Sequence, residues 1–194
     1  MRPASRTPTA GTRIENWTGR QFAGHLDEAM RIYASAMRYP AHTGAQRGVS
    51  ARKHVTHGGF ACRAALTDDG TLIGFGYGYT TRPGQWWHDL VRRALSAEAA
   101  AAWLVEAFEL SELHVLPEHQ GAGIGRQLLT SLAGGIPHTA MLLSTPDSDT
   151  RAFRLYRDLG FVDLARNYLF PGDARPFAVL GARLPLEQSN SRAI

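Results

Sequence analysis

Three glycines at every second position separate an apolar run from a helix-like run in the stretch HVLPEHQGAGIGRQLL, residues 114–129. A strand, a glycine-rich turn and a helix can hold phosphate, because the first backbone N–H groups of a helix have no intrahelical partner. The helix dipole adds about 0.3–1 kcal/mol for an anion placed there. Side chains at Gly121, Gly123 and Gly125 would block the approach of such a ligand, so the spacing predicts a phosphate-binding loop.

Two common phosphate-binding loops do not fit this spacing. A P-loop requires G-x-x-x-x-G-K-[ST], and here Arg126 follows Gly125 without the lysine and hydroxyl pair. A Rossmann loop requires G-x-G-x-x-G near the start of a βαβ unit, whereas these glycines are spaced G-x-G-x-G and come late in the chain.

A third family fits better. The stretch QGAGIG at 120–125 resembles the Q/R-x-x-G-x-G/A pyrophosphate loop of the GCN5-related N-acetyltransferases (GNAT). The preceding ELHVLPEH is similar to that family's L-x-V-x-P strand, and RAFRLYRDLGF at 151–161 is similar to its A-x-x-L-Y-x-x-L-G-F helix. The three elements occur in the family's order, and the resemblance extends roughly from residue 72 to 184.

The resemblance implies a fold and a co-substrate. The expected fold is a single GNAT-type α/β domain with a mixed, mostly antiparallel sheet, splayed central strands and flanking helices. Acetyl-CoA would lie between the strands 109–116 and 139–145, with the pantetheine arm paired to one strand and the pyrophosphate in the glycine loop. A backbone N–H near Val115 would polarise the thioester carbonyl. The residues implied in binding acetyl-CoA are Leu113, His114, Val115, Gln120, Gly121, Ala122, Gly123, Ile124, Gly125 and Arg126.

The resemblance also implies a general acid, Tyr156, which would protonate the departing CoA thiolate. A phenol with a pKa near ~10 can share or relay a proton to a thiolate of pKa near ~8.5. The alternative is that Tyr156 is a core tyrosine. Two positions depart from the family pattern: Asp149 replaces a frequent asparagine and is expected to cap the following helix, and Ser144 replaces the glutamate of some N-terminal-amine acetyltransferases.

Acyl transfer also needs a neutral amine. A lysine-like acceptor costs about 4.6 kcal/mol to deprotonate at pH 7. Glu109 and Glu112 lie on the expected CoA-binding strand, and alternation of side chains predicts that they face opposite sides of the sheet. We favour Glu112 narrowly as the base, with His114 on its face; Glu109 or a water path is the alternative.

The elements that position these residues follow from hydrophobic periodicity and turn signals. The DDGT at 68–71 between two apolar runs predicts a hairpin. The glycine face of its second strand, Gly74, Gly76 and Gly78, predicts close approach by a helix or a ligand. The expected strands are 13–17, 60–67, 72–80, 109–116, 139–145, one from 161 onward and 177–184. The expected helices are 21–37, 46–57, 124–133 and 149–159, with a Pro/Gly loop at 39–44.

A helical insertion, 84–104, precedes the CoA-binding strand, where the resembled family usually has a tight turn. Adjacent residues cannot share one helix face. One of Trp86 and Trp87 is therefore expected to pack inward and the other to line the acceptor site, although both could simply anchor the insertion.

Composition limits the remaining possibilities. The chain has 194 residues, 44% of them hydrophobic, and fits one domain at 13–186 with loose tails at 1–12 and 187–194. The net charge of +4 is too dispersed for a nucleic-acid footprint, and no stretch is apolar enough for a membrane helix. With Lys53 the only lysine and Cys62 the only cysteine, we expect a cytoplasmic protein from a GC-rich bacterium.

Two functions of different class fit these observations. The first is an N-acetyltransferase that moves an acetyl group directly to a small-molecule or peptide amine, as a monomer or homodimer. The second is a GNAT-like module that binds CoA without turnover. We expect no metal, since His54 and His57 lie three residues apart without a third ligand in view.

Overall fold

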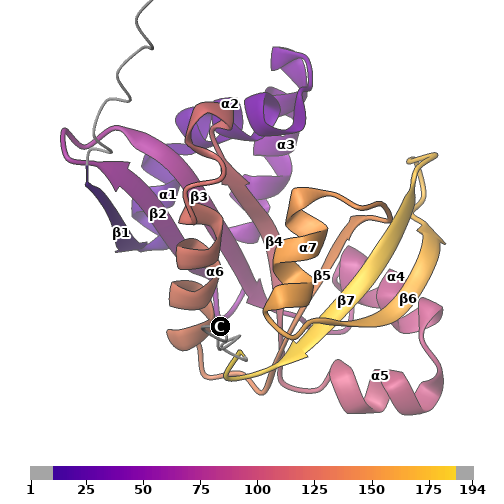
Figure 1. Cartoon of the computed structure of the whole chain (residues 1–194). Coiled ribbons are helices and arrows are strands. Elements are labelled where there is room, and N and C mark those ends of the chain that lie inside the picture. The colour runs from indigo at the N-terminus through magenta and orange to yellow at the C-terminus, as the bar shows by residue number, and fades with distance from the viewer. Residues whose placement is uncertain (1–10, 187–194) are drawn as a thin grey trace, which may run out of the picture.

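A seven-stranded sheet runs through residues 11–186, the part of the chain that the computed structural model describes (Figure 1). Its strand order is β1-β2-β3-β4-β5-β7-β6, and every neighbouring pair is antiparallel except β4 and β5. The strands are β1 Thr12–Trp17, β2 Ala61–Thr67, β3 Leu72–Thr80, β4 Ala107–Val115, β5 Ala140–Pro146, β6 Val162–Leu169 and β7 Pro176–Arg183. All seven expected strands are present, and the mixed, mostly antiparallel sheet is confirmed.

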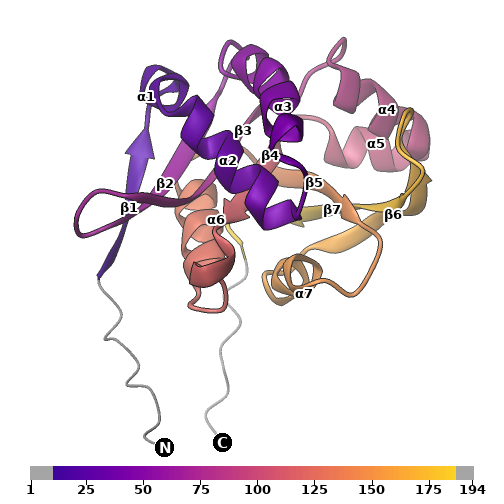
Figure 2. The same ribbon diagram turned by 90° about the horizontal axis from the view of Figure 1, so that it is seen from above.

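Helices cover both faces of the sheet. Figure 2 shows α6 and α7 on one face and α1 to α5 on the other. The helices are α1 Gly19–Gly24, α2 Leu26–Met37, α3 Ala41–His54, α4 Trp86–Ala94, α5 Ala97–Trp103, α6 Ile124–Gly134 and α7 Arg151–Asp158, with a short 3-10 turn at Pro117–His119. Among the described residues, no helix combines the length and hydrophobicity needed to cross a bilayer.

The chain ends were expected to be loose tails at 1–12 and 187–194. Residues 1–10 and 187–194 lie outside the described residues. Strand β1 already begins at Thr12, one residue before the expected domain boundary.

Two helix predictions at the N-terminal side were wrong. The expected helix 21–37 is two helices, because the chain breaks at His25, directly after Gly24. The expected loop 39–44 is largely helix, since α3 begins at Ala41. Its Gly44 lies against α2, where a Cβ would be 2.7 Å from the carbonyl oxygen of Met30. This glycine allows α2 and α3 to pack closely. A local sequence pattern does not distinguish a glycine at a helix contact from a glycine in a loop.

The expected glycine face of β3 lies against protein. A Cβ at Gly78 would be 2.0 Å from the carbonyl oxygen of Glu109, and one at Gly74 would be 3.4 Å from Leu128 of α6. The opposite face carries Phe75 and Tyr77, which pack in the core beneath α1 and α2. The close approach is therefore made by β4 and α6, and the aromatic face of β3 supports the helices that border the site.

Strands β4 and β5 pair over three residues only, from Ala107 opposite Ala140 to Glu109 opposite Leu142. Beyond Glu109, β4 keeps only β3 as a partner in the described sheet. The expected splay is confirmed, and it begins at the carboxylate of Glu109.

The insertion forms α4 and α5, which pack as one layer against β5 and β7. Trp87, Leu90 and Val91 of α4 contact the core side of these strands together with Ala100 of α5. The helical insertion is confirmed, and it forms one wall beside the splayed strands.

Candidate active site

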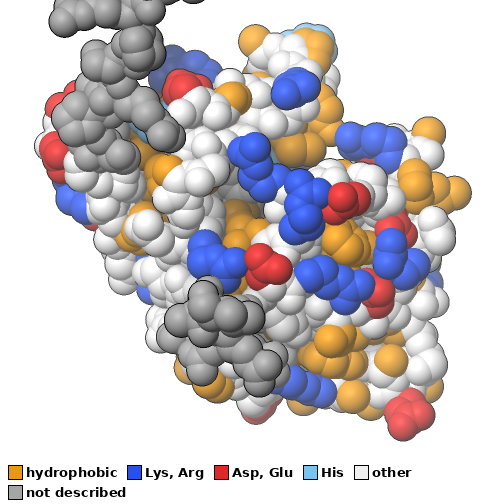
Figure 3. Space-filling view, viewed as in Figure 1, with side chains coloured by type: hydrophobic (Ala, Val, Ile, Leu, Met, Phe, Trp, Pro, Cys, Tyr) orange, Lys and Arg blue, Asp and Glu red, His pale blue; other side chains and the backbone are white. Residues whose placement is uncertain are grey.

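A cavity of about 1190 Å³ begins at the splay of β4 and β5. It extends from the first turn of α6 and from α7 to the end of α2, to α3 and to α4. Figure 3 shows Lys and Arg side chains around the hollow between α6 and α7, and Arg126 and Arg151 line the cavity there. Positive charge concentrated at one end of a cleft favours an anionic ligand.

The glycine loop presents backbone N–H groups to this end of the cavity. Gly121 and Gly123 have left-handed φ angles of 86° and 82°, and Gly123 is the N-cap of α6 without a side-chain cap. Nothing lies within 4 Å of a Cβ placed at Gly123, and Leu155 lies 3.6 Å from one placed at Gly125. The uncapped N-terminus of α6 thus has the open cradle that a pyrophosphate needs.

Gln120 and Ala122 complete the loop in different ways. The amide of Gln120 donates a 2.9 Å hydrogen bond to the carbonyl oxygen of Val115, and its oxygen accepts from Arg151 at 3.4 Å. Gln120 therefore ties the loop to the end of β4 and to α7. Ala122 is exposed between the two left-handed glycines.

The residues of β4 expected to bind the pantetheine arm border the splay. Leu113, His114 and Val115 pair with Gly76, Phe75 and Gly74 of β3 on one edge. Their other edge has no strand partner in the described sheet, so an extended ligand can bind there as a further strand would. The open edge and the glycine cradle belong to one continuous cavity.

Tyr156 of α7 lies in the same cavity, only 6% exposed and 5.5 Å from the ring of Phe161. Burial and, to a smaller extent, the charge of Glu112 raise the pKa of its phenol. The phenol is therefore neutral and can donate a proton.

The prediction that Asp149 caps α7 was wrong. The side chain of Thr150 accepts a hydrogen bond from the N–H of Phe153, whereas Asp149 pairs with Arg154.

The two glutamates face the same side of the sheet, contrary to expectation. Glu112 lies opposite Tyr77 and Glu109 lies opposite Tyr79, and these tyrosines share one face of β3. Ser111 is an extra residue in β4, and this β-bulge cancels the alternation that three residues would otherwise produce. His114 shares the face of Glu112, as expected.

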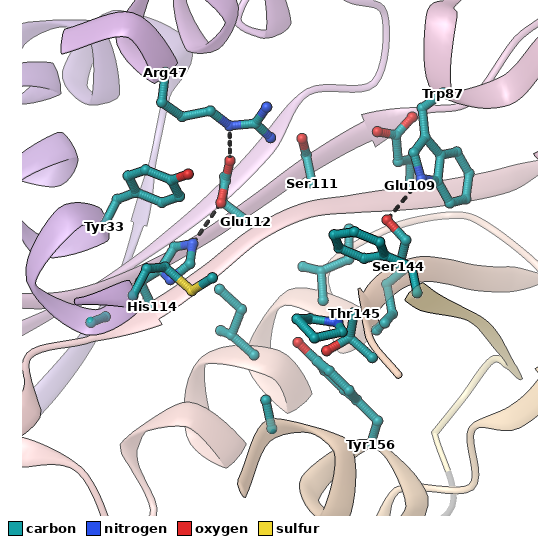
Figure 4. Close-up of a pocket in the computed structure, with 18 of the residues that line it drawn as sticks. Tyr33, Arg47, Trp87, Glu109, Ser111, Glu112, His114, Ser144, Thr145 and Tyr156 are labelled. Atoms are coloured by element: carbon teal, nitrogen blue, oxygen red, sulfur yellow. Dashed lines mark hydrogen bonds and ion pairs between the residues drawn. The ribbon is translucent and has the colours of Figure 1, made fainter. Parts of the chain in front are cut away.

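Glu112 is held by two cationic or polar partners (Figure 4). Arg47 of α3 donates to Oε1, and Nε2 of His114 lies 2.5 Å from Oε2. Burial alone raises the pKa of this carboxyl, but the charge of Arg47 and the contact with His114 outweigh it and lower the pKa to about 2. Glu112 is a fixed negative charge at working pH.

Glu109 has a different environment. The side chain is 4% exposed, Oε1 accepts a 2.9 Å hydrogen bond from the Tyr79 hydroxyl, and Oε2 has no hydrogen-bond partner among residues 11–186. Burial raises its pKa to about 8, although the hydrogen bond from Tyr79 works in the opposite direction. This carboxyl can take and release a proton near neutral pH.

A comparison with known proteins gives the family. The profile of the acetyltransferase (GNAT) domain matches residues 64–163, just over half of the chain. The chain belongs to the GNAT acetyltransferases. A GCN5-like protein acetyltransferase of Mycobacterium tuberculosis, Rv2170, is 37% identical over 190 residues, covering 83% of this chain and 92% of that protein.

Solved GNAT structures share the fold. A GNAT-family acetyltransferase of Bacillus cereus matches 89% of this chain and 97% of its own at a TM-score of 0.60 and 14% identity. The protein yncA of Salmonella typhimurium, solved with its cofactor acetyl-CoA, matches 95% and 100% at a TM-score of 0.62 and 15% identity. This GNAT enzyme is accordingly an acetyl-CoA-dependent acyltransferase, and its glycine cradle and open strand edge fit that co-substrate.

The far end of the acetyltransferase's cavity is bordered by the insertion. Trp87 is 7% exposed and its Nε1 donates a 3.1 Å hydrogen bond to the Ser144 hydroxyl. Trp86 is 62% exposed and lies 5.8 Å from the ring of Phe170. Trp87 therefore packs inward and Trp86 is exposed at the cavity. Adjacent residues of one helix are expected to face different directions in this way.

Several residues of this GNAT site escaped sequence reasoning. The sequence around Arg47 has only a weak helical pattern, which does not indicate a site residue. Ser111 was not predicted either, because a β-bulge cannot be recognised from residue types.

The rings of His54 and His57 stack with their centroids 5.9 Å apart. Among the described residues, no group of three or more His, Cys, Asp or Glu could hold a metal ion. Both histidines line the cavity instead.

Proposed function

We propose that this acetyltransferase moves the acetyl group from acetyl-CoA directly to a primary amine, with Glu109 as the proton acceptor. One observation carries the proposal: a buried carboxyl with an unpartnered oxygen lies in the cavity where β4 and β5 separate. Direct transfer needs a group there that can take a proton from the amine.

The choice between the two glutamates follows from the cost of proton transfer. A lysine-like amine has a pKa near ~10.4, so proton transfer to the ionised form of a carboxyl of pKa about 8 costs about 3 kcal/mol, whereas transfer to the ionised form of one of pKa about 2 costs about 11 kcal/mol. Because Glu109 is mostly protonated at pH 7, it accepts the proton in its ionised fraction, which grows as pH rises toward 8. We therefore reverse the preference drawn from the sequence. Glu109 takes the proton, and Glu112 stays ionised beside it because it is paired with Arg47.

The other residues have complementary roles. Acetyl-CoA, when bound, supplies the acetyl group and the thiolate leaving group. The backbone of Leu113 to Val115 aligns the pantetheine arm, and a backbone N–H near Val115 polarises the thioester carbonyl. Tyr156 holds the proton that the sulfur takes up.

The acceptor class is a peptide or protein amine in this proposal. The relative at 37% identity is named a protein acetyltransferase. The cavity is open beside exposed Trp86, which supplies an apolar contact for the aliphatic part of a lysine side chain. A small-molecule amine is the second class to be tested. A cytoplasmic location, a bacterial source and the oligomeric state stay predictions from the sequence.

The test measures CoA thiol release by the purified protein with four acceptors: a lysine-containing peptide, the same peptide with its lysine acetylated, a polyamine and an aminoglycoside. We expect release with the unmodified peptide and none with its acetylated form, which controls for hydrolysis. Release with the polyamine or the aminoglycoside alone would replace the peptide class by a small amine. A protein that binds acetyl-CoA but releases no thiol with any acceptor would contradict the proposed transfer.

A further inference from the structure

Helix α3 presents a row of hydrogen-bond donors to the end of the cavity that lies away from the glycine loop. Arg47, Ser50 and Lys53 all line the cavity, and they follow one another at intervals of three residues. At a rise of about 1.5 Å per residue, this α3 donor row is about 9 Å long. The sequence of α3, AHTGAQRGVSARKH, contains no Asp or Glu that could neutralise the row from within the helix.

The α3 donor row runs alongside the two glutamates of β4. Its first member, Arg47, donates to the carboxylate of Glu112. At the other end of the row, the ring of His54 lies 5.0 Å from the ring of Tyr79, whose hydroxyl is bonded to Glu109. A molecule whose amine lies at Glu109 therefore has this side of α3 beside it.

The donors of the row are unused among residues 11–186. Arg47 bonds Glu112 through Nε, and its two terminal nitrogens have no hydrogen-bond partner in that range. Figure 4 shows the guanidinium extending past Glu112 on the side of Ser111. The hydroxyl of Ser50 and the ammonium of Lys53 also lack a side-chain partner within 11–186. Ser50 is half-buried and Lys53 is exposed, so both can be reached by a ligand in the cavity.

The charge of Lys53 is not balanced at this end of the cavity. The two arginines that line the cavity away from the glycine loop are each paired, Arg47 with Glu112 and Arg175 with Asp173. Lys53 has no carboxylate within ion-pair distance in the described part of the chain. An acceptor ammonium therefore meets a net positive charge, which favours an acceptor that carries its own anionic group.

We propose that Arg47, Ser50 and Lys53 form a carboxylate-binding subsite, and that the preferred acceptor is a lysine with an acidic residue within two positions of it. The terminal nitrogens of Arg47 and the hydroxyl of Ser50 donate to the carboxylate oxygens, and Lys53 supplies the charge that they neutralise. This inference rests on the proposed peptide acceptor. It also makes a polyamine a poor acceptor, because a polyamine has no negative charge for this subsite.

The spacing of the site fits such a peptide. Glu112 and Glu109 lie opposite Tyr77 and Tyr79, which are two residues apart on β3. Two residues of a strand span about 7 Å, and an extended peptide places side chains two residues apart on one face at the same spacing. One peptide can therefore place its amine at Glu109 and a carboxylate at the end of the subsite where Arg47 lies.

The test uses three peptides that have a blocked N-terminus and one lysine, and that differ only at the positions two residues before and after it. These positions hold Asp, Ala or Arg. For the wild type, we expect kcat/KM, measured by thiol release, to be at least about fivefold higher with the Asp peptide than with the Ala peptide. The preference should decrease as sodium chloride is added, because salt screens the exposed charge of Lys53.

Three variants assign the preference to the α3 donor row. Lys53→Glu should remove the Asp preference and make the Arg peptide the best acceptor, and Lys53→Gln should reduce the preference without reversing it. Ser50→Ala, which removes a donor at constant charge, should reduce the preference by about threefold. The matched control is Arg52→Glu, which changes the net charge as Lys53→Glu does at an exposed neighbour that does not line the cavity. Arg52→Glu should keep the wild-type preference.

The outcomes separate this inference from the function on which it rests. Equal kcat/KM for all three peptides would overturn the subsite and leave the peptide acceptor standing. An Asp preference that persists unchanged in folded Lys53→Glu, Lys53→Gln and Ser50→Ala would also overturn the subsite, because the carboxylate would then be bound elsewhere.

A small-molecule pair covers the remaining case. Nα-acetyllysine has one amine and a free carboxylate, and Nα-acetyllysine amide lacks the carboxylate. If no peptide is acetylated but Nα-acetyllysine is preferred to its amide in a manner that Lys53→Glu abolishes, the peptide class is wrong and the carboxylate subsite stands. Absence of turnover with all peptides and both lysine derivatives would contradict the subsite together with the proposed acceptor.

Discussion

Tyr79 and Glu109 lie directly opposite each other on β3 and β4, and the tyrosine hydroxyl donates a 2.9 Å hydrogen bond to one oxygen of the glutamate. The other oxygen has no partner among the described residues and lies where β4 separates from β5. A buried carboxyl in this state holds a proton up to a pH of about 8. Its ionisation therefore links the activity of the enzyme to the stability of the fold.

Glu109→Gln is expected to stabilise the fold at alkaline pH. The folded-state pKa of about 8 exceeds the ordinary value of 4.5, so between these pH values the folded protein keeps a proton that the unfolded chain has lost. The wild-type contribution is fully present below pH 4.5 and is lost as pH rises through 8. Thermal unfolding should show equal Tm values at pH 4 and a higher Tm for the variant at pH 9. Equal Tm values at both would mean that the carboxyl is not held protonated by the fold.

Glu112→Gln should act in the opposite direction on stability. Its folded-state pKa of about 2 means that it contributes stability above pH 4.5, which is lost as pH falls through 2. The variant also leaves Arg47 without its carboxylate, so we expect a lower Tm at pH 7. Its kcat should fall less than that of Glu109→Gln, for which about 10²–10⁴-fold is expected. A larger loss of kcat in folded Glu112→Gln would restore Glu112 as the base.

Gly125→Val should abolish acetyl-CoA binding without straining the backbone. Gly123 has a φ of 82°, so a side chain there would be strained whatever the ligand does. Gly125 lacks a left-handed φ, and its Cβ would make an ordinary 3.6 Å contact with Leu155. We expect the Tm increase that acetyl-CoA gives the wild type to disappear in this variant. Gly134→Val, at the other end of α6 with open space around its Cβ, should keep the increase. Undiminished acetyl-CoA affinity in folded Gly125→Val would remove the loop from the binding site.

Tyr156→Phe should lower turnover while leaving the affinity for acetyl-CoA nearly intact. Burial raises the pKa of the phenol, so the hydroxyl carries its proton throughout the working pH range. Loss of a general acid reduces kcat by about 10²–10⁴-fold. The ring packs against Phe161, and phenylalanine preserves this contact. A decrease of less than about threefold at every pH would leave Tyr156 as a core residue only.

Trp86→Ala and Trp87→Ala should separate acceptor binding from folding. Trp86 is exposed, so its removal should raise the acceptor KM at least about tenfold with little change in Tm. Trp87 is buried and bonded to Ser144, so its removal should lower the Tm by several degrees. Unchanged acceptor kinetics in the Trp86 variant would show that the insertion has a structural role alone.

The sequence by itself determined the family, the order of the strands along the chain and the glycine-rich turn between β4 and α6. These depend on local patterns: glycines at every second position, the apolar strand before them, and the tyrosine helix that ends at Gly160. Backbone requirements of this kind can be recognised from the residue type, because only glycine readily allows both a left-handed φ and close approach of a ligand.

Only the tertiary structure decided the placement and the surroundings of the two glutamates. Their placement on one face depends on the bulge at Ser111, and a single inserted residue reverses every expectation based on alternation. Their different pKa values depend on partners from distant parts of the chain, Arg47 of α3 for Glu112 and Tyr79 of β3 for Glu109. Desolvation and charge act over a few ångströms in space, and the sequence does not record which side chains lie within that distance.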